Sequence, residues 1–303
     1  MGPACTCLSG TLPTKNIHTV IQDIYQLIKT RGWFTSELEE DHARRVAQRL
    51  RAHWAEQTEK PTLRLSQMGL RCPCALWHSI HTPELREPLP PWAEVKYAFG
   101  HDIEALAITL CKAAGHTVEG EQDVVVVDGI AGHRDAVVDG CIVDFKSSSS
   151  RGMEKFKKGS QSSLDQRDDF GYLEQVDGYV VGSLTDPLVR VKDRGYLFAI
   201  DKTLGHCNLY EHYTRETHIR QRIADSKSII ALDRPPRCTC ETVPHGKSGN
   251  IALGTVASYN PFKYCCKPQL RTFLYADKPV YLVHIERLPD VAEITREGQI
   301  ILN

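Results

Sequence analysis

The sequence has almost no excess of charge. Its 303 residues include 37 lysines and arginines against 38 aspartates and glutamates, which gives a formal net charge of −1. A domain that binds nucleic acid usually has a clearly positive balance. The chain as a whole therefore gives no sign of binding polyanions over its surface, and any polyanion site has to be local.

Long hydrophobic runs are also missing. No apolar stretch approaches the roughly 20 residues of a membrane-spanning helix, and the first residues do not show the basic-then-apolar pattern of a signal peptide. We therefore expect no membrane association and a cytoplasmic location.

Cysteine, by contrast, is abundant, with 11 residues. In a reducing compartment, clustered cysteines bind metals more often than they form disulfides. Cys111 lies in an apolar helical stretch and Cys141 in an apolar strand, so we interpret both as packing residues. Three close pairs need another explanation: residues 72 and 74, 238 and 240, and 265 and 266.

Hydrophobic periodicity divides the chain into helical and extended stretches. It predicts helices at residues 17–30, 36–57, 92–114, 170–183 and 216–232, and strands at 116–149, 194–202, 206–214 and 271–288. Ser36 and Glu39 predict a capping box at the start of the second helix. Residues 1–15 show no periodicity, and we expect them to be mobile. This order predicts an α/β (α+β) fold with a central mixed sheet flanked by helices.

The stretch "GHRDAVVDGCIVDFKSSSS" at residues 132–150 predicts a hairpin. Asp139-Gly140 between two β-rich runs is typical of a two-residue turn, because both central residues need φ > 0. Counting outward from that turn, Asp135 faces Asp144 and His133 faces Lys146. Side chains alternate faces along a strand, so these four polar groups are predicted on one face.

Two opposed carboxylates repel each other. At about 5 Å and an effective dielectric constant near 20, the repulsion is about 3 kcal/mol. One interpretation is a hairpin whose polar face is solvated. The other is a divalent cation, Mg²⁺ or Mn²⁺, that cancels the repulsion, since hard oxygen ligands suit these ions. The hairpin alone leaves both interpretations open.

Other polar groups flank the hairpin. His101 and Glu104 are one turn apart in a predicted helix and on their own would be ordinary surface residues. The Ser-rich segment 147–169 is either a solvated loop or a path for phosphates, through Arg151, Lys155, Lys157 and Lys158. The helix that follows carries Tyr172, Gln175 and Tyr179 on one face.

Taken in order, these motifs resemble the PD-(D/E)xK nuclease superfamily, and more narrowly its RecB-type exonucleases, found in phages and among CRISPR-associated adaptation nucleases. The stretches that resemble the family are "GHDIEAL", "GHRDAVVDG", "VDFKSSS" and "GYLEQVDGY", and the resemblance covers roughly residues 17–290. It implies a helical region at 1–91, a restriction-endonuclease-like core at 92–235, and a cysteine-bearing segment with a closing hairpin at 236–303 packed on that core.

The resemblance also implies roles for single residues. Asp135 and Asp144 would bind Mg²⁺ or Mn²⁺, with His101 or Glu104 and the backbone carbonyl of Phe145 completing the site. Lys146 would orient or deprotonate the attacking water and stabilise developing charge. Gln175 and Tyr179, which form the Gln-x-x-x-Tyr motif, would contact DNA or support the lysine. Tyr172 and the four basic residues of segment 147–169 would contact DNA. His133 either touches phosphate or is a hydrogen-bonded strand histidine.

The cysteines resemble the family only in part. Cys72 in "MGLRCPCALWHS" and Cys266 in "SYNPFKYCC" match two ligands of an iron–sulfur cluster. Where relatives carry a Cys-x-x-Cys, this chain has Ala257 and Asn260. Cys238 and Cys240 could replace the missing pair, so the four thiols would bind an iron–sulfur cluster, zinc or nothing.

The function implied by the resemblance is a metal-dependent DNA exonuclease that degrades single-stranded ends with 5′→3′ polarity, in phage recombination or DNA processing. A recombination partner protein and an oligomeric state are compatible with this function. Two alternatives remain: a structure-specific endonuclease on the same fold, and a catalytically silent DNA-binding or assembly subunit. Opposed carboxylates favour catalysis, because a binding subunit has no need of them.

Overall fold

The computed structural model describes residues 15–55, 61–276, 278–296 and 298–301. The expectations for residues 1–14, including Cys5 and Cys7, and for the end of the predicted helix 36–57 lie outside this range. None of the helices in the described range combines the length and the apolar character that crossing a lipid bilayer requires.

The predicted helices are present. The α-helices are α1 (Val20–Ile28), α2 (Ser36–Trp54), α3 (Pro73–His81), α4 (Pro91–Ala113), α5 (Tyr172–Gly182), α6 (Glu216–Ile230), α7 (Thr255–Ser258) and α8 (Lys263–Cys266). The capping box predicted at Ser36 is wrong by one residue. Thr35 is the N-cap of α2, and its hydroxyl accepts a hydrogen bond from the backbone N–H of Leu38 at 3.3 Å.

A five-stranded sheet forms the centre of the molecule. In spatial order its strands are β1 (Val118–Glu119), β4 (Ala136–Val138), β5 (Cys141–Ser148), β6 (Arg194–Asp201) and β7 (Cys207–Tyr213). β5 and β6 are parallel, whereas the other neighbours are antiparallel. The sheet is therefore mixed, which confirms the predicted fold class.

The predicted hairpin is β4–β5, and its register is the one counted from the turn. Asp139 and Gly140 have φ values of 50° and 80°, as a two-residue turn of this type requires. The pairs run outward from Val138 with Cys141 to Ala136 with Val143. Asp135 comes one residue beyond the last pair.

The register does not extend to His133, and the prediction that His133 faces Lys146 is wrong. His133 ends β3 (Ile130–His133) and pairs with Val124 of β2 (Val124–Val127) in a separate two-stranded sheet. The chain leaves the first pairing at Arg134, a buried side chain held in ion pairs by Asp123 at 2.8 Å and Asp186 at 2.6 Å.

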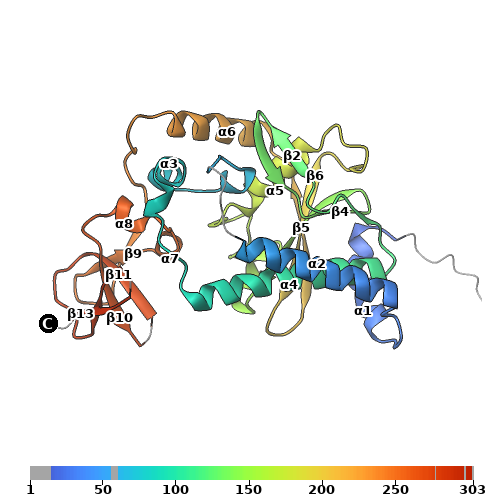
Figure 1. The fold of residues 1–303 in the computed structure, drawn as a ribbon, viewed down its shortest axis with the longest axis horizontal. Coiled ribbons are helices and arrows are strands. Elements are labelled where there is room, and N and C mark those ends of the chain that lie inside the picture. Colours follow the sequence, from blue (N-terminus) through green and yellow to red (C-terminus); the bar gives the residue numbers. More distant parts are fainter. Residues whose placement is uncertain (1–14, 56–60, 277, 297, 302–303) are drawn as a thin grey trace, which may run out of the picture.

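Helices cover both faces of the central sheet (Figure 1). One face packs against α5 and α6 through residues such as Ile142 and Leu197, and the other packs against α1 and α4 through Val143 and Phe198. Both faces of the hairpin are consequently buried. The interpretation of a solvated polar face is wrong.

A second sheet occupies the C-terminal part of the chain, at one end of the molecule (Figure 1). Its order is β13 (Ile300–Ile301), β12 (Glu293–Ile294), β10 (Arg271–Tyr275), β11 (Lys278–His284), β9 (Ile251–Leu253) and β8 (Thr242–Pro244). The predicted hairpin at 271–288 is β10–β11. The sequence analysis did not predict the strands that extend it into a six-stranded sheet.

Candidate active site and cysteine cluster

Asp144 and Lys146 lie on the same face of β5, the strand at the centre of the sheet. Asp144 is completely buried, and no hydrogen bond reaches its Oδ1 atom from any described residue. The Lys146 Nζ atom lies 2.5 Å from Asp144 Oδ2. The sheet thus holds a carboxylate away from water with one ammonium group as its counter-ion.

Asp135 is brought to the same place by the bend at the start of β4. Its Oδ2 atom accepts a hydrogen bond from the backbone N–H of Phe145 at 2.8 Å, between the positions of Asp144 and Lys146. Its Oδ1 atom is 3.4 Å from the amide nitrogen of Gln122. The backbone at Phe145 therefore lies directly beside the Asp135 carboxylate.

Glu104 completes a group of three carboxylates from the direction of α4. The Gln122 amide that contacts Asp135 also donates to Glu104 Oε1 at 3.2 Å, and Arg49 of α2 forms an ion pair with the same oxygen. His101 lies one turn earlier on α4, with its ring 5.3 Å from that of His53. Of the two helix residues left open by the sequence, Glu104 shares a donor with Asp135.

The electrostatics show how strongly the carboxylates affect one another. Burial and the Asp135 charge raise the pKa of Glu104 to about 8, although Arg49 opposes the shift. Burial raises the pKa of Asp144 to about 7, against the effect of Lys146. Burial alone would lower the pKa of Lys146, but the charges of Asp144 and Asp135 raise it above its ordinary value. A divalent cation fits this set of oxygens, because it would favour the ionised carboxylates that the protein alone disfavours.

Lys146 is fixed by side chains of α5. Its Nζ atom is 3.4 Å from Gln175 Oε1 and 5.1 Å from the centre of the Tyr172 ring. The Gln175 amide donates to the hydroxyl of Tyr179 at 2.8 Å. Tyr179 is buried in the core, so of its two predicted roles the geometry favours supporting the lysine over contacting DNA.

These groups open into a cleft of about 1040 Å³. Its walls come from α4, β5, the segment before α5, and the C-terminal residues 239–241 and 256–262. The predicted site residues that line it are His101, Glu104, Asp135, Phe145, Lys146, Lys155, Tyr172, Cys72 and Cys240. Asp144 lies beneath the cleft rather than on its surface.

The segment 147–169 is anchored to the core, although residues 157–159, 161–162 and 165–167 are exposed to solvent. Met153, Phe156 and Leu164 are buried in the core. Of its basic residues Lys155 lines the cleft, whereas Lys157 pairs with Glu154 at 2.6 Å and the lining of the cleft does not include it.

Three other predicted DNA contacts lie off the cleft. Lys158 pairs with Glu211 at 3.6 Å, and Arg151 is exposed but does not line the cleft. The Nδ1 atom of His133 lies 3.2 Å from the backbone oxygen of Gln122. His133 is therefore a hydrogen-bonded strand histidine.

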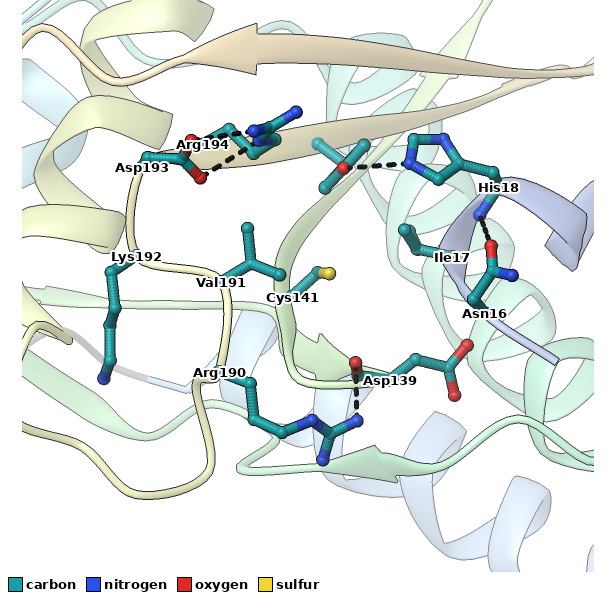
Figure 2. A pocket seen from close by; sticks show the side chains of 11 residues that line it. Asn16, Ile17, His18, Asp139, Cys141, Arg190, Val191, Lys192, Asp193 and Arg194 are labelled. Atoms are coloured by element: carbon teal, nitrogen blue, oxygen red, sulfur yellow. Dashed lines mark hydrogen bonds and ion pairs between the residues drawn. The ribbon is translucent and has the colours of Figure 1, made fainter. Parts of the chain in front are cut away.

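A second hollow, of about 570 Å³, lies beside the β4–β5 turn (Figure 2). Its charged groups are already paired within the protein. Arg194 forms an ion pair with Asp193 at 2.7 Å, and Arg190 donates to the backbone oxygen of Asp139 at 2.8 Å. None of the predicted site residues lines this hollow, so the cleft at Lys146 is the candidate active site.

Four cysteines from distant parts of the chain meet near one end of the cleft. The Sγ atoms of Cys72, Cys238, Cys240 and Cys266 all lie within 4.8 Å of one another. The distances from Cys72 Sγ to Cys238 Sγ and to Cys266 Sγ are both 3.8 Å. The structure therefore gathers the four cysteines that the sequence analysis selected.

The spacing of these sulfurs distinguishes between kinds of metal centre. A tetrahedral ion with metal–sulfur bonds of about 2.3 Å holds its thiolates roughly 3.8 Å apart. A cubic iron–sulfur cluster binds each thiolate to a different iron and spreads the sulfurs more widely. The observed distances fit a single tetrahedral ion, such as zinc.

The pKa values of the clustered thiols also indicate that a bound cation would favour their ionised forms. Hydrogen bonds from Cys240 and Cys266 lower the pKa of Cys72 far below its usual value. Contacts with Cys240, Cys72 and Cys74 raise the pKa of Cys266. Without a cation the group thus favours the thiolate at Cys72 and disfavours it at Cys240 and Cys266. The amide of Asn260 donates to Cys240 and Cys266 Sγ at 3.4 Å each.

The sequence analysis missed three residues of these sites. Arg49 and Gln122 contact the carboxylates from segments with no recognisable motif, and only helical spacing on α2 could have indicated that Arg49 faces α4. Asn260 was noted only as a departure from the family pattern. Its amide is a hydrogen-bond donor to two of the clustered sulfurs.

No protein family matches the sequence of the chain, and no curated protein matches it. Among solved structures, the crystal structure of SSO0001 is 15% identical, with a TM-score of 0.39 over 77% of this chain and 97% of the other. The crystal structure of an alkaline exonuclease from Laribacter hongkongensis is 13% identical, with a TM-score of 0.30 over 70% of this chain and 84% of the other. Likenesses this low leave the function of the chain to be inferred from its own side chains.

Proposed function

We propose that the chain is a divalent-metal-dependent DNA nuclease of the PD-(D/E)xK superfamily, in its RecB-type exonuclease branch. The observation that carries the proposal is the buried Asp144 carboxylate, which has an oxygen without a hydrogen-bond donor among the described residues and lies beside Asp135 and Lys146 beneath an open cleft. If Asp144 and Lys146 formed only a structural ion pair, the site would not need the Asp135 and Glu104 carboxylates as well.

Asp135, Asp144 and Glu104 would hold Mg²⁺ or Mn²⁺, with the backbone carbonyl of Phe145 as a further oxygen. The ion, when bound, supplies positive charge to the phosphoryl oxygens and the leaving group. Glu104 is favoured over His101 as the helix ligand, because it shares the Gln122 amide with Asp135.

Lys146 would place its ammonium group against the scissile phosphate and stabilise the negative charge that develops there. Gln175 fixes the position of that ammonium group, and Tyr179 fixes Gln175.

For the cysteine cluster we propose a structural metal ion on Cys72, Cys238, Cys240 and Cys266. Thiolate sites of this kind contribute folding energy directly. The sulfur spacing favours one zinc ion over an iron–sulfur cluster. Such an ion would join the segment at Cys72, in the proposed helical region 1–91, to the proposed C-terminal segment 236–303 across the nuclease core 92–235.

The substrate we propose is DNA with free, single-stranded ends, degraded in the 5′→3′ direction in the cytoplasm during phage recombination or DNA processing. A recombination partner protein and an oligomeric assembly fit this setting. The main alternative is a structure-specific endonuclease, because the same catalytic groups would cleave internal bonds if the cleft admitted them.

The test is incubation of the purified chain with end-labelled single-stranded and double-stranded DNA and with covalently closed circles, with and without Mn²⁺. We expect release of nucleotides from linear single strands, dependent on Mn²⁺, and no cleavage of circles. Nicked circles would favour the endonuclease. Binding of DNA without any hydrolysis would favour the silent subunit.

A further inference from the structure

Three aromatic side chains line the cleft and are unusually exposed. Tyr97 of α4 is 52% exposed, Phe170 before α5 is 45% exposed, and Tyr259 after α7 is 60% exposed. Each comes from a different part of the chain, yet all three border the same hollow as Lys146. Exposed apolar groups that gather in one groove often mark a ligand-binding site.

Phe170 and Tyr259 belong to a row of rings that leads from the core to the outer end of the cleft. The ring centres of Phe156 and Tyr172 are 6.1 Å apart, those of Tyr172 and Phe170 are 5.9 Å apart, and those of Phe170 and Tyr259 are 6.3 Å apart. The first two pairs are nearly parallel, with interplanar angles of 20° and 25°. The row begins buried at Phe156 and ends exposed at Tyr259.

Positive charge accompanies the row. Lys155 Nζ lies 5.2 Å from the centre of the Phe170 ring and 4.5 Å from that of Tyr172. Arg86, Lys96 and Lys202 also line the cleft and are exposed, and no carboxylate among the described residues lies within 4.0 Å of any of them. Cations that have no acidic partner among the described residues and that line the same cleft as exposed rings suit a ligand that has both phosphates and flat bases.

Two aromatic side chains that are similarly exposed lie outside the cleft and outside the row of rings. Phe34 is 47% exposed and contacts Trp33 and His42, and Tyr213 is 55% exposed under Arg194. Neither lines the cleft. Exposure alone therefore does not mark a binding site, whereas exposure together with the row, the cations and the nearby catalytic lysine does.

From this arrangement we infer that Phe170 and Tyr259 stack on unpaired bases of a DNA strand whose phosphate reaches Lys146. This inference rests on the proposed nuclease function and specifies how the site selects its substrate. Bases inside a duplex already stack on both neighbours and are paired at their edges, so they present no free face to these rings. The row thus selects single-stranded DNA by its bases, while the cations hold the backbone.

The cysteine cluster positions one end of this row. Tyr259 directly precedes Asn260, whose amide donates to the sulfurs of Cys240 and Cys266. Thr239, between two of the clustered cysteines, also lines the cleft and donates to the backbone oxygen of Arg71. A metal ion on the thiols would therefore hold the wall of the cleft that carries Tyr259.

The test measures binding alone, by fluorescence anisotropy in the absence of divalent metal, so that hydrolysis plays no part. The probes are a fluorescein-labelled oligothymidylate, an oligonucleotide of the same length made of abasic nucleotides, and a blunt duplex. Stacking on one base changes affinity by about 5- to 150-fold. We expect Phe170→Leu and Tyr259→Leu each to weaken oligothymidylate binding within this range, and to leave binding of the abasic strand unchanged.

Two further variants serve as controls. Phe170→Trp keeps a flat ring and is expected to retain affinity for the oligothymidylate. If Phe170 served only to pack within the protein, the larger ring of tryptophan would fit less well and affinity would fall. Phe34→Leu removes a ring of similar exposure outside the cleft and is expected to change nothing.

The inference is overturned if Phe170→Leu weakens both strands equally, if it weakens neither, or if the wild type does not bind the oligothymidylate. Failure of the nuclease proposal gives a different result. In that case oligothymidylate binding and its dependence on Phe170 persist, but no nucleotides are released when Mn²⁺ is added.

Discussion

The carboxylate site and the cysteine cluster both gather groups that repel one another when ionised, but the protein neutralises them to different extents. At the carboxylates, Lys146 pairs with Asp144 and Arg49 pairs with Glu104. At the thiols, the described donors include the amide of Asn260, a neutral group. The first site carries its own cations, whereas the second is contacted by a donor without charge.

This difference assigns different roles to the two metals that we propose. A site with internal cations can fold without an added ion, so its metal can exchange with solvent and serve catalysis. A group of four thiols within 4.8 Å of one another needs a cation to ionise fully, so its metal belongs to the folded state. The predictions below test this division, beginning with the largest expected effect.

Asp144→Asn and Lys146→Ala should each lower the turnover of DNA hydrolysis by about 10²- to 10³-fold or more, because the first weakens a ligand of the proposed metal ion and the second removes the positive charge against the reacting phosphate. Rates of nucleotide release at saturating DNA measure the effect, and gel-shift titration should show little change in DNA affinity. Lys278→Ala, on β11 of the second sheet, is the matched control and should retain full turnover. Near wild-type rates in both site variants would place the chemistry elsewhere.

The carboxylate site was largely predictable because it depends on local geometry. The Asp139-Gly140 turn fixes the register of the hairpin, and the register places Asp144 and Lys146 on one face. The same reasoning failed at His133, because it assumed an uninterrupted strand. The buried Arg134, with its ion pairs to Asp123 and Asp186, redirects the chain, and nothing in the local pattern reveals such long-range partners.

The cysteine cluster was predictable for a different reason. Thiols in a reducing compartment need a chemical explanation wherever they lie in the chain, so residue type alone selected them. The partners that complete both sites were not predictable. Arg49 and Asn260 act through tertiary packing, and the extra strands of the second sheet are only two or three residues long, too short to show a period of two.

Cys266→Ser should abolish metal binding at the thiols and lower the free energy of unfolding by several kcal/mol, since such sites contribute directly to folding. Cys111→Ser is the matched control. Burial raises the pKa of Cys111 to about 12, so this thiol stays neutral and holds no metal; its substitution should cost about 1 kcal/mol. Urea unfolding and elemental analysis for zinc and iron measure both effects. Folded Cys266→Ser with unchanged stability, from a wild type that contains neither metal, would contradict a metal centre.

Mn²⁺ should raise the melting temperature of the wild type, because an ion at 100 times its dissociation constant adds about 2.7 kcal/mol of stability. Asp135→Asn should remove most of this shift, since it takes a charged ligand from the carboxylate site. Differential scanning calorimetry at several Mn²⁺ concentrations provides the measurement. An equal shift in both proteins would show that Mn²⁺ stabilises the fold from another place.

Asp41, with Arg45 and Lys112, forms a reference group in which the protein's own cations neutralise the carboxylate. Burial tends to raise the pKa of Asp41, but hydrogen bonds from Arg45 at 2.6 Å and Lys112 at 3.0 Å outweigh it and lower the pKa to about 2. Because this value lies below the unfolded value of about 4, the pairing stabilises the protein above that pH and is lost as the pH falls toward 2.

Asp41→Asn should therefore lower the free energy of unfolding at neutral pH by about 1–2 kcal/mol, and the difference should shrink as the pH falls toward 2. Chelators should not alter it. Urea unfolding of both proteins across this pH range is the measurement. A difference that is independent of pH would mean that Asp41 contributes through packing rather than charge.

The most direct test of the division between the two sites is to remove divalent cations with a mild chelator and then to measure DNA hydrolysis and the metal content of the protein in the same sample. We expect hydrolysis to stop while the protein stays folded and keeps about one zinc ion, and we expect Mn²⁺ alone to restore full activity. Hydrolysis that continues after all exchangeable cations have been removed would contradict the account, because Lys146 and the carboxylates would then catalyse the reaction without the ion that we assign to them.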